Sequence, residues 1–496
     1  MSRDLLLGVD FGTGGCKVAL VDTSGCVVDA ASGEYATEHP RAGWAQQNPA
    51  DWYATMRRLL HELAAGPAWK SGRLVAMAMD SYTHGAVLLD ERGEVIRPTI
   101  IWTDQRSVSE CEFLTERFGE MIFKTAYQMP APTWTLPQML WLRRNEPESF
   151  SRIRRISFVK DYIRYLLTGE LACDCIESQG TLMWDMKKSC WSPELCELAG
   201  VDVGMLGPVA QPTALAGKVT AKAAMETPLP AGLPVIMGAS DSAVEGYAAG
   251  AIRPGQCILK LATAGNVNVM TDQAHPHPQT LTYSHVVPGM WYTVTATNAA
   301  AACQRWYRDN FCGDLVAAGA AQNKDVYGLI NDEAATSPCG ANGVFFHPYL
   351  MGERSPYWDA NLRASFSGLS MRNTRADLSR AVLEGVAYSL RDCYGTIEKM
   401  GLSTHEFLLI GGGAKSELWS QIVCDVFNAA VTCPAACDAS FGSALVAGVG
   451  IGVFASEIDA VRKCVKVSRK LEPVKENAEF YAEGFKRYRN IHDRLA

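Results

Sequence analysis

Residues 235–246 read VIMGASDSAVEG, an apolar run that ends in small residues and then places one carboxylate, Asp241, where a helix is expected to begin. Near the N-terminus, residues 5–15 read LLLGVDFGTGG, again an apolar run that ends in an aspartate, Asp10, and continues into glycines. Both patterns predict a strand whose end carries a functional side chain, which is where sites are usually built on α/β sheets. We interpret Asp241 as a catalytic base, and Asp10 with its loop as a binding site for phosphate and Mg²⁺.

The turn after Asp10 is suited to phosphate. Gly12, Gly14 and Gly15 permit positive φ angles, and successive N–H groups in such a turn can approach an anion closely. A plain hairpin explains this short pattern equally well. The turn lacks the GxxxxGK[ST] pattern, which excludes a Walker-type P-loop.

A similar strand–turn–strand pattern returns about 250 residues later. Residues 256–261 and 267–270 are expected strands, joined by a turn of small residues at 262–266. Two halves that each begin with a hairpin suited to phosphate predict a duplicated fold with a cleft between the halves. Further on, the expected strand 407–410 leads into the glycines at 411–413, a platform for a nucleotide or simply a tight strand–helix turn.

The spacing of apolar residues and the positions of proline and glycine predict the remaining elements. Pro49 to Ala65 is an expected helix, with proline near its first position and apolar residues at helical spacing. The other expected segments are interrupted helices over 107–170, a loop and strand over 174–184, a connecting surface segment over 208–234, a buried helix over 442–455 and a charged amphipathic surface helix over 477–495.

Length and composition limit the classes of protein. A chain of 496 residues is too long for one core and predicts two or more domains. A net charge of −7 argues against a nucleic-acid surface, and no apolar stretch is long enough to span a bilayer. Sixteen cysteines without a secretory signal indicate reduced thiols. We therefore expect a cytoplasmic protein with no nucleic-acid or membrane partner, and a homodimer as the favoured oligomer.

Two further strand ends carry candidate ligand-binding side chains. His84 follows the expected strand 74–79, and Trp102 and Asp104 follow residues 100–101. An indole wall beside carboxylates suits a polyhydroxylated ligand, whose C–H face packs on the ring while its hydroxyls bond the acids. A histidine taken alone is more often structural, so His84 counts only if other site residues converge on it.

Together these stretches resemble the FGGY family of carbohydrate kinases, and within it the xylulokinases, in one order over nearly the whole chain. The resemblance is carried by Asp10-Phe11-Gly12-Thr13, Thr83-His84-Gly85, residues 102–106, Lys160-Asp161-Tyr162, Thr168-Gly169-Glu170, Asp241, residues 352–356, residues 364–369, residues 377–384 and Gly411-Gly412-Gly413-Ala414.

The resemblance implies an α/β fold with two actin-like (ribonuclease H-like) ATPase domains flanking a cleft in which ATP and sugar meet. The expected domains are residues 1–246, with the sugar pocket and the first phosphate loop, and residues 247–472, with the second phosphate loop and the adenosine site. Residues 473–496 form a helix whose docking domain stays open.

The resemblance also implies roles for single residues. Asp241 takes the proton of the sugar hydroxyl that attacks the γ-phosphate, and Asp10 lies near Mg²⁺, which it holds through water. The residues implied for the nucleotide are Gly12, Thr13, Gly14, Lys17, Thr263, Ala264, Gly265, Gly412, Gly413 and Glu417. The residues implied for the sugar are Thr83, His84, Trp102 and Asp104, together with Asp241.

The expected activity is ATP-dependent phosphorylation of a small sugar, a ketopentose such as a xylulose, at a primary hydroxyl. The chain departs from the family pattern at Thr83, Ser242 and Ala262. A polyol or another ketose is therefore an alternative substrate, and a sugar-binding member that has lost turnover is an alternative function. An actin- or Hsp70-like ATPase shares the fold but is disfavoured by His84, Trp102 and Asp104.

Overall fold

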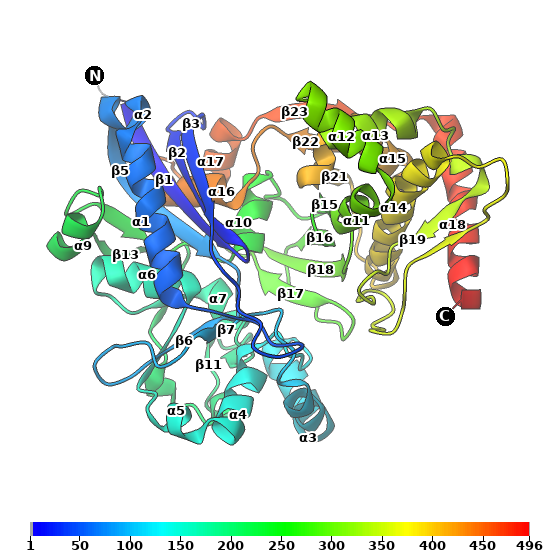
Figure 1. Ribbon diagram of the computed structural model, residues 1–496. Coiled ribbons are helices and arrows are strands. Elements are labelled where there is room, and N and C mark those ends of the chain that lie inside the picture. Colours follow the sequence, from blue (N-terminus) through cyan, green and yellow to red (C-terminus); the bar gives the residue numbers. More distant parts are fainter. Residues whose placement is uncertain (1–2, 496) are drawn as a thin grey trace.

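The computed structural model describes residues 3–495 and shows two lobes, each built on one mixed sheet (Figure 1). The first sheet has the order β13-β14-β5-β1-β2-β3, and the second β17-β18-β16-β15-β21-β22-β23. The strands of the first are β1 (Arg3–Gly12), β2 (Gly15–Asp22), β3 (Val27–Glu34), β5 (Gly72–Ser81), β13 (Leu215–Lys218) and β14 (Pro234–Ile236). Those of the second are β15 (Gln256–Leu261), β16 (Gly265–Thr271), β17 (Leu281–Ser284), β18 (Trp291–Thr297), β21 (Glu406–Ile410), β22 (Val431–Pro434) and β23 (Val467–Leu471).

The two sheets repeat one arrangement at their centres. In the first, the antiparallel hairpin β1–β2 is continued by β5, which pairs parallel to β1. In the second, the antiparallel hairpin β15–β16 is continued by β21, which pairs parallel to β15. The predicted repeat of strand, turn and strand is therefore confirmed, and each copy places its turn at the end of a central strand.

Two helices, α10 (Asp241–Ala248) and α16 (Ala439–Gly450), lie between the sheets (Figure 1). Small residues let the backbones meet there: a Cβ on Gly8 would lie 1.7 Å from the carbonyl oxygen of Ser440. A Cβ on Gly442 would lie 2.5 Å from that of Val244. The predicted buried helix over 442–455 is thus confirmed as α16, with earlier bounds. Although α16 comes late in the chain, it packs on β1 and β5 of the first sheet.

Two helices of the first lobe begin or end at residues suited to those positions. Helix α1 spans Pro49–Ala65 as expected, and the Asn48 side chain caps it by accepting a hydrogen bond from the N–H of Ala50 at 3.1 Å. Helix α6 (Val159–Thr168) ends at Gly169, whose φ of 80° is the left-handed conformation that glycine adopts without strain.

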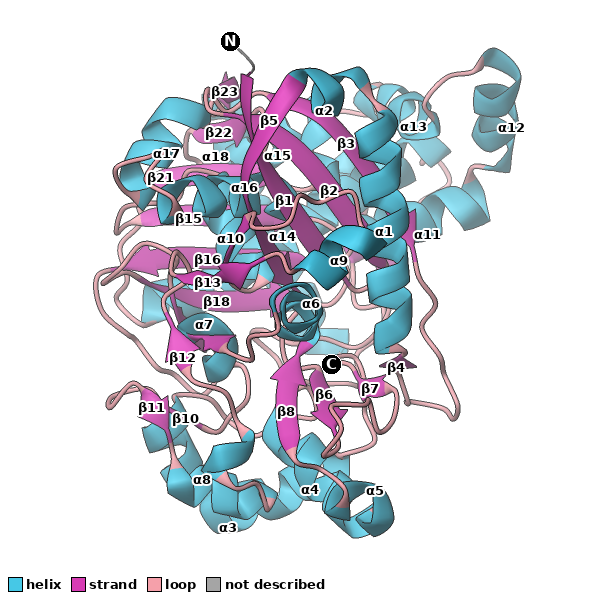
Figure 2. Ribbon diagram, turned by 90° about the vertical axis from the view of Figure 1, so that its left-hand side faces the viewer, coloured by secondary structure: helices cyan, strands magenta, loops and turns pink. Residues whose placement is uncertain are grey.

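The segment between β5 and β13 departs most from prediction. It contains α3 (Val108–Ala126), α4 (Thr135–Asn145) and α5 (Pro147–Ser151), but also an unpredicted strand, β8 (Arg155–Phe158), paired with β6 (Ala86–Leu89). A loop and strand were expected over 174–184, but α7 (Cys175–Gln179) begins there, capped by the side chain of Asp174. A five-residue helix shows too little periodicity to be recognised. Helices α3, α4, α5 and α8 (Pro193–Ala199) gather at the lower end of Figure 2.

The expected surface segment over 208–234 also needs correction, because it holds the edge strand β13 and helix α9 (Ala221–Glu226).

At the other end of the chain, α18 (Lys475–Leu495) docks on the second lobe. Tyr481 and Tyr488 are fully buried, and the Tyr481 hydroxyl donates to Glu384 at 2.7 Å. Among residues 3–495, no helix combines the length and apolarity needed to cross a membrane.

Candidate active site

Two of the predicted site residues, Asp10 and Asp241, meet between the sheets with a third carboxylate, Asp80. Asp10 and Asp80 are register partners on the adjacent parallel strands β1 and β5. Burial, reinforced by the charge of Asp241, raises the pKa of Asp10 to about 7. Burial and the neighbouring Asp10 raise the pKa of Asp80 well above its usual value. The cluster therefore gathers three carboxyl groups, two of them with raised pKa values, where the sequence predicted a binding site for a metal and phosphate.

Asp241 is the first residue of α10, as predicted, and residues 237–240 separate it from the end of β14. Ser240 caps the helix, and Asp241 Oδ1 accepts a hydrogen bond from the N–H of Ser242 at 2.6 Å. The side chain is only partly buried. Burial raises its pKa, while the positive charge of Lys260 lowers it. The arrangement is that of a carboxylate that can take a proton.

The turn after β1, which is predicted to bind phosphate, is held by hydrogen bonds to its carbonyl groups and is exposed at Gly14. Tyr35 donates its hydroxyl proton to the carbonyl of Gly12, and Gln47 Nε2 donates to the carbonyl of Thr13 at 2.7 Å. Gly14 is exposed, with no atom within 4 Å of where a Cβ would stand. The Asp10 Oδ1 oxygen lies 3.9 Å from the Cβ position of Gly12, so the carboxylate points under the turn.

The second turn, after β15, is held in place by hydrogen bonds that its carbonyl groups accept from backbone N–H groups at the start of α11 (Ala301–Phe311). The N–H of Ala301 donates to Ala262 at 2.7 Å, and the N–H of Ala300 donates to Thr263 at 2.9 Å. Thr263 is exposed, and Ala264 is partly buried. At Gly265 a Cβ would lie 2.8 Å from Thr297 Cγ2, so the hairpin requires glycine there.

Trp102 contacts the first turn from a different part of the chain, and His84 follows the end of β5. Trp102 Nε1 donates to Thr13 Oγ1 at 2.8 Å. His84 adopts φ 80°, and its N–H donates to Glu177 Oε1 at 3.1 Å. Since a carbonyl only accepts, the contact of 2.5 Å between Nδ1 and the Gly180 carbonyl places the ring proton on Nδ1. Burial lowers the pKa of His84 to about 4, so the ring is neutral.

In this tautomer His84 Nε2 accepts a hydrogen bond from the hydroxyl of Thr83 at 2.7 Å. Thr83 itself is partly exposed, while the imidazole is buried. Of the two, Thr83 therefore presents the more accessible polar atom.

The predicted role of Asp104 in binding the sugar needs a correction. Its Oδ1 accepts from the N–H and the Nε of Arg106 at 2.8 and 2.9 Å. Its Oδ2 accepts from Arg106 Nη2 at 2.8 Å and from the N–H of Ala45 at 2.5 Å. Both side chains of this ion pair are fully buried. Because both oxygens are occupied, Asp104 holds the loop that carries Trp102 and has no oxygen to offer a sugar.

The remaining predicted nucleotide residues differ in their surroundings. Lys17 Nζ lies 2.9 Å from Asp438 Oδ2, so this lysine is already paired at the N-terminus of α16. Gly412 is exposed, and Gly413 is buried with its Cβ position 2.8 Å from Leu261 Cβ. The side chain of Glu417, at the start of α15 (Glu417–Phe427), is 87% exposed, 3.6 Å from an Arg469 nitrogen.

Sequence reasoning assigned no role to five charged residues of this region: Asp80, Glu177, Glu245, Lys260 and Asp438. Asp80 and Lys260 had a signal, because each is a charge that follows a run of apolar residues near the end of its strand. Glu177, Glu245 and Asp438 had none, since a charge on or before a helix is ordinarily solvated.

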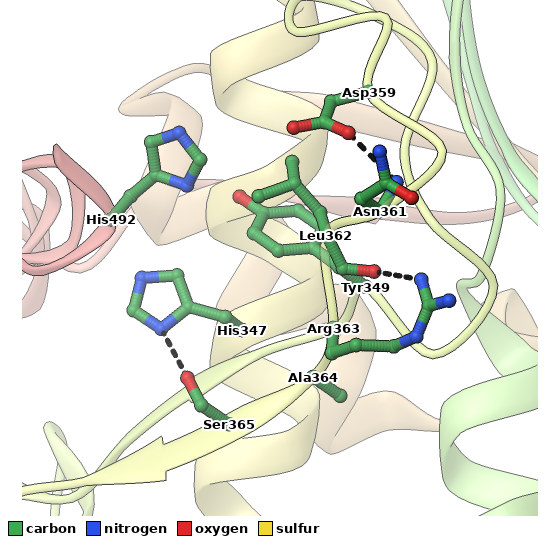
Figure 3. A pocket seen from close by; sticks show the side chains of 9 residues that line it. All are labelled: His347, Tyr349, Asp359, Asn361, Leu362, Arg363, Ala364, Ser365 and His492. Atoms are coloured by element: carbon green, nitrogen blue, oxygen red, sulfur yellow. Dashed lines mark hydrogen bonds between the residues drawn. The ribbon is translucent and has the colours of Figure 1, made fainter. Parts of the chain in front are cut away.

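A separate cavity of about 420 Å³ opens on the second lobe, and no predicted site residue lines it (Figure 3). Its lining residues are His347, Tyr349, Asp359, Asn361, Leu362, Arg363, Ala364, Ser365 and His492. Within it, His347 Nδ1 lies 3.4 Å from Ser365 Oγ, and His492 comes from α18.

Family comparisons agree with the expected domain types. The model of the N-terminal domain of the FGGY family of carbohydrate kinases matches residues 5–246, and that of the C-terminal domain matches residues 262–451. The xylulose kinase of Staphylococcus epidermidis is 30% identical over 495 residues, covering 99% of this chain and 97% of the relative. The xylulose kinase of Escherichia coli K12 is 31% identical over 424 residues, covering 85% and 84%.

Solved structures agree with the fold. The xylulose kinase of Rhodospirillum rubrum superposes with a TM-score of 0.89 at 30% identity and covers 99% of both chains. The gluconate kinase of Lactobacillus acidophilus reaches a TM-score of 0.90 at 24% identity, with coverage of 100% and 98%, which speaks for the fold alone. The predicted pair of actin-like α/β domains and the resemblance stated from the sequence are confirmed.

Proposed function

Because the chain belongs to the FGGY family of carbohydrate kinases, we propose that it transfers the γ-phosphate of ATP to a primary hydroxyl of a pentulose such as xylulose. Relatives named xylulose kinases, matching 99% and 85% of the chain, support the pentulose. The observation that carries the mechanism is the position of Asp241, at the first turn of α10 and within electrostatic reach of Asp10.

Asp241 acts as the general base. It takes the proton of the sugar hydroxyl as the oxygen attacks the γ-phosphorus, a contribution of typically 10²–10⁴-fold. Burial raises its pKa, which makes it a better proton acceptor than an exposed aspartate. The two turns at Gly12–Gly14 and Thr263–Gly265 would hold the phosphates, and Gly412, Gly413 and Glu417 would flank the adenosine.

The residues around Asp10 fit a magnesium ion. Asp10 Oδ1 is buried and has no hydrogen-bond partner within residues 3–495, and carboxylate oxygens are ligands that Mg²⁺ prefers. Asp10 would hold the ion through water. When bound, the ion would neutralise charge on the phosphates.

The sugar side favours an uncharged ligand. Thr83 offers a hydroxyl and Trp102 a ring face, while neutral His84, bonded at both ring nitrogens, adds no positive charge. A gluconokinase of Bacillus subtilis is 26% identical over 479 residues, yet an aldonate would bring a carboxylate to this neutral wall. We therefore favour a ketose over a sugar acid. The cytoplasmic location and the homodimer stay predictions.

A coupled assay of ADP release tests the proposal. Purified protein with ATP and Mg²⁺ is offered pentuloses, hexuloses, polyols and gluconate, and we expect turnover of about 1–100 s⁻¹ with a pentulose. Release only with a polyol would change the substrate class. No release with any compound, together with a sugar-dependent rise in melting temperature, would favour a sugar-binding protein without turnover. ATPase activity independent of sugar would instead favour the function of an actin- or Hsp70-like ATPase.

A further inference from the structure

Lys260 occupies, in the second hairpin, the place that Asp10 occupies in the first. Asp10 stands three residues before Thr13, and Lys260 stands three residues before Thr263. Side chains alternate along a strand, and Leu259 and Leu261 belong to the core of the second lobe. Lys260 therefore faces the other side, toward the layer that holds α10, as Asp10 does from the first sheet.

Contacts along β15 support this orientation. Ile258, two residues before Lys260 and on the same face, approaches α10: its Cδ1 lies 3.1 Å from the Cβ position of Gly246. The Lys260 ammonium forms an ion pair with Glu245, which stands four residues after Asp241 on the same helix. The side chains are 25% and 19% exposed, so the pair is neither sealed in the core nor fully solvated.

Lys260 also acts electrostatically on the catalytic base. Its positive charge lowers the pKa of Asp241, and the charges of Glu245 and Asp241 together raise the pKa of Lys260 despite burial. Glu245 takes the ammonium in the ion pair, which leaves the carboxylate of Asp241 free to accept a proton. The lysine thus carries a full positive charge between the base and the second phosphate turn.

The charges around the site show what this cation is suited for. Asp10, Asp80, Asp241, Glu245 and Asp438 form an acidic cluster, in which the charges of Asp241, Glu245 and Asp438 raise the pKa of Asp10 and those of Asp10 and Asp241 raise the pKa of Asp80. On the β2 side, Lys17 is engaged by Asp438. A phosphoryl group in transfer spreads negative charge over three oxygens and needs positive charge fixed in place beside them. A lysine on a flexible four-carbon stem provides this as a point charge.

Resting on the kinase function proposed above, we propose that Lys260 is a catalytic residue whose ammonium leaves Glu245 and donates a hydrogen bond to an oxygen of the transferred γ-phosphoryl group. The bond from the sugar oxygen to the γ-phosphorus forms while the bond to the β–γ bridging oxygen breaks. The electron pair leaves with ADP, and the hydroxyl proton goes to Asp241. Lys260 keeps its protons throughout and stabilises the charge on the phosphoryl oxygens.

Kinetics of matched variants test the assignment. Lys260→Met removes the charge and keeps the stem, and we expect kcat to fall about 10²–10³-fold with the sugar KM within about twofold. The acid limb of the pH–rate profile of this variant should move to higher pH, because the pKa of Asp241 rises when a neighbouring cation is lost. Lys260→Arg should recover part of kcat. The control is Arg253→Met, which removes an exposed cation paired with Glu406 at 2.7 Å before the start of β15 and should change neither constant.

Nucleotide binding separates this inference from the kinase proposal. By calorimetry without sugar, Lys260→Met should weaken a nonhydrolysable ATP analogue at least tenfold more than ADP, because only the former carries a γ-phosphate. Equal weakening of both nucleotides, or unchanged kcat in Lys260→Met, would overturn the role of Lys260. If the wild-type protein turns over no sugar but Lys260→Met still weakens the ATP analogue selectively, the proposed activity is overturned and the contact of Lys260 with the γ-phosphate is kept.

Discussion

Trp102 Nε1 donates a hydrogen bond of 2.8 Å to Thr13 Oγ1, which joins the proposed sugar wall directly to the first phosphate turn. The turn is also held by Gln47, whose Nε2 reaches the Thr13 carbonyl at 2.7 Å. Gln47 Oε1 in turn accepts from the hydroxyl of Tyr82 at 2.8 Å, next to Thr83 and His84. A sugar packed on the indole can therefore influence the turn that would bind phosphate.

Replacing Trp102 by phenylalanine keeps a ring but removes the bond to Thr13. A hydrogen bond of this kind contributes about 1 kcal/mol, so we expect kcat/KM to fall about fivefold. A double-mutant cycle with Thr13→Val checks the cause: the two losses should not add if they remove the same bond. Additive losses would show that the bond does not couple the two sites.

The base assignment predicts a much larger effect on kcat. Asp241→Asn keeps the shape of the side chain and removes its basicity, so kcat should fall by about 10²–10⁴-fold. Steady-state kinetics give the loss, while calorimetry with a nonhydrolysable ATP analogue should show nearly unchanged binding. Wild-type turnover in this variant would refute the role of Asp241.

The activity should also depend on pH above the ordinary range of an aspartate. Burial raises the pKa of Asp241 from 3.8. Asp10, Asp80 and Glu245 are the acidic groups near Asp241, and Lys260 is a nearby cation that lowers its pKa. The base acts when deprotonated, so kcat/KM should be full above the raised pKa and fall as the pH drops through it. An acid limb near pH 4 in a pH–rate profile would contradict the raised value.

The sequence predicted the two hairpins, their turns and Asp241 because these are local patterns: an apolar run, then small residues, then a charge. It could not predict that Arg106 takes up both oxygens of Asp104, since whether a carboxylate is free depends on its neighbours in space. For the same reason Glu177 had no visible link to His84, although its carboxylate accepts the backbone N–H of this residue. The short helix α7 that carries Glu177 was missed as well.

The position of His84 can be disturbed from Gly180 without changing the histidine. A Cβ on Gly180 would lie 2.8 Å from His84 Nδ1, closer than real contacts allow, while Trp134 packs against the other side of the ring with centroids 4.7 Å apart. Gly180→Ala should displace the imidazole and raise the sugar KM about tenfold, with little change in the ATP KM. Gly395→Ala is the control, since no atom lies within 4 Å of its Cβ position. An unchanged sugar KM in Gly180→Ala would argue that His84 takes no part in the pocket.

The contact between the sheet and the central helices should be equally sensitive to one methyl group. A Cβ on Gly8 would stand 1.7 Å from the Ser440 carbonyl oxygen and 2.8 Å from the Ala444 nitrogen, and neither backbone atom can rotate away. Gly8→Ala must push α16 off β1, and overpacking of this kind costs about 1–3 kcal/mol or more. We expect a clear fall in melting temperature and, because α16 also packs on α10, a fall in kcat. Gly313→Ala, with open space around its Cβ position, should leave both nearly unchanged. If Gly8→Ala melts with the wild type, the backbones of β1 and α16 are not in direct contact at Gly8.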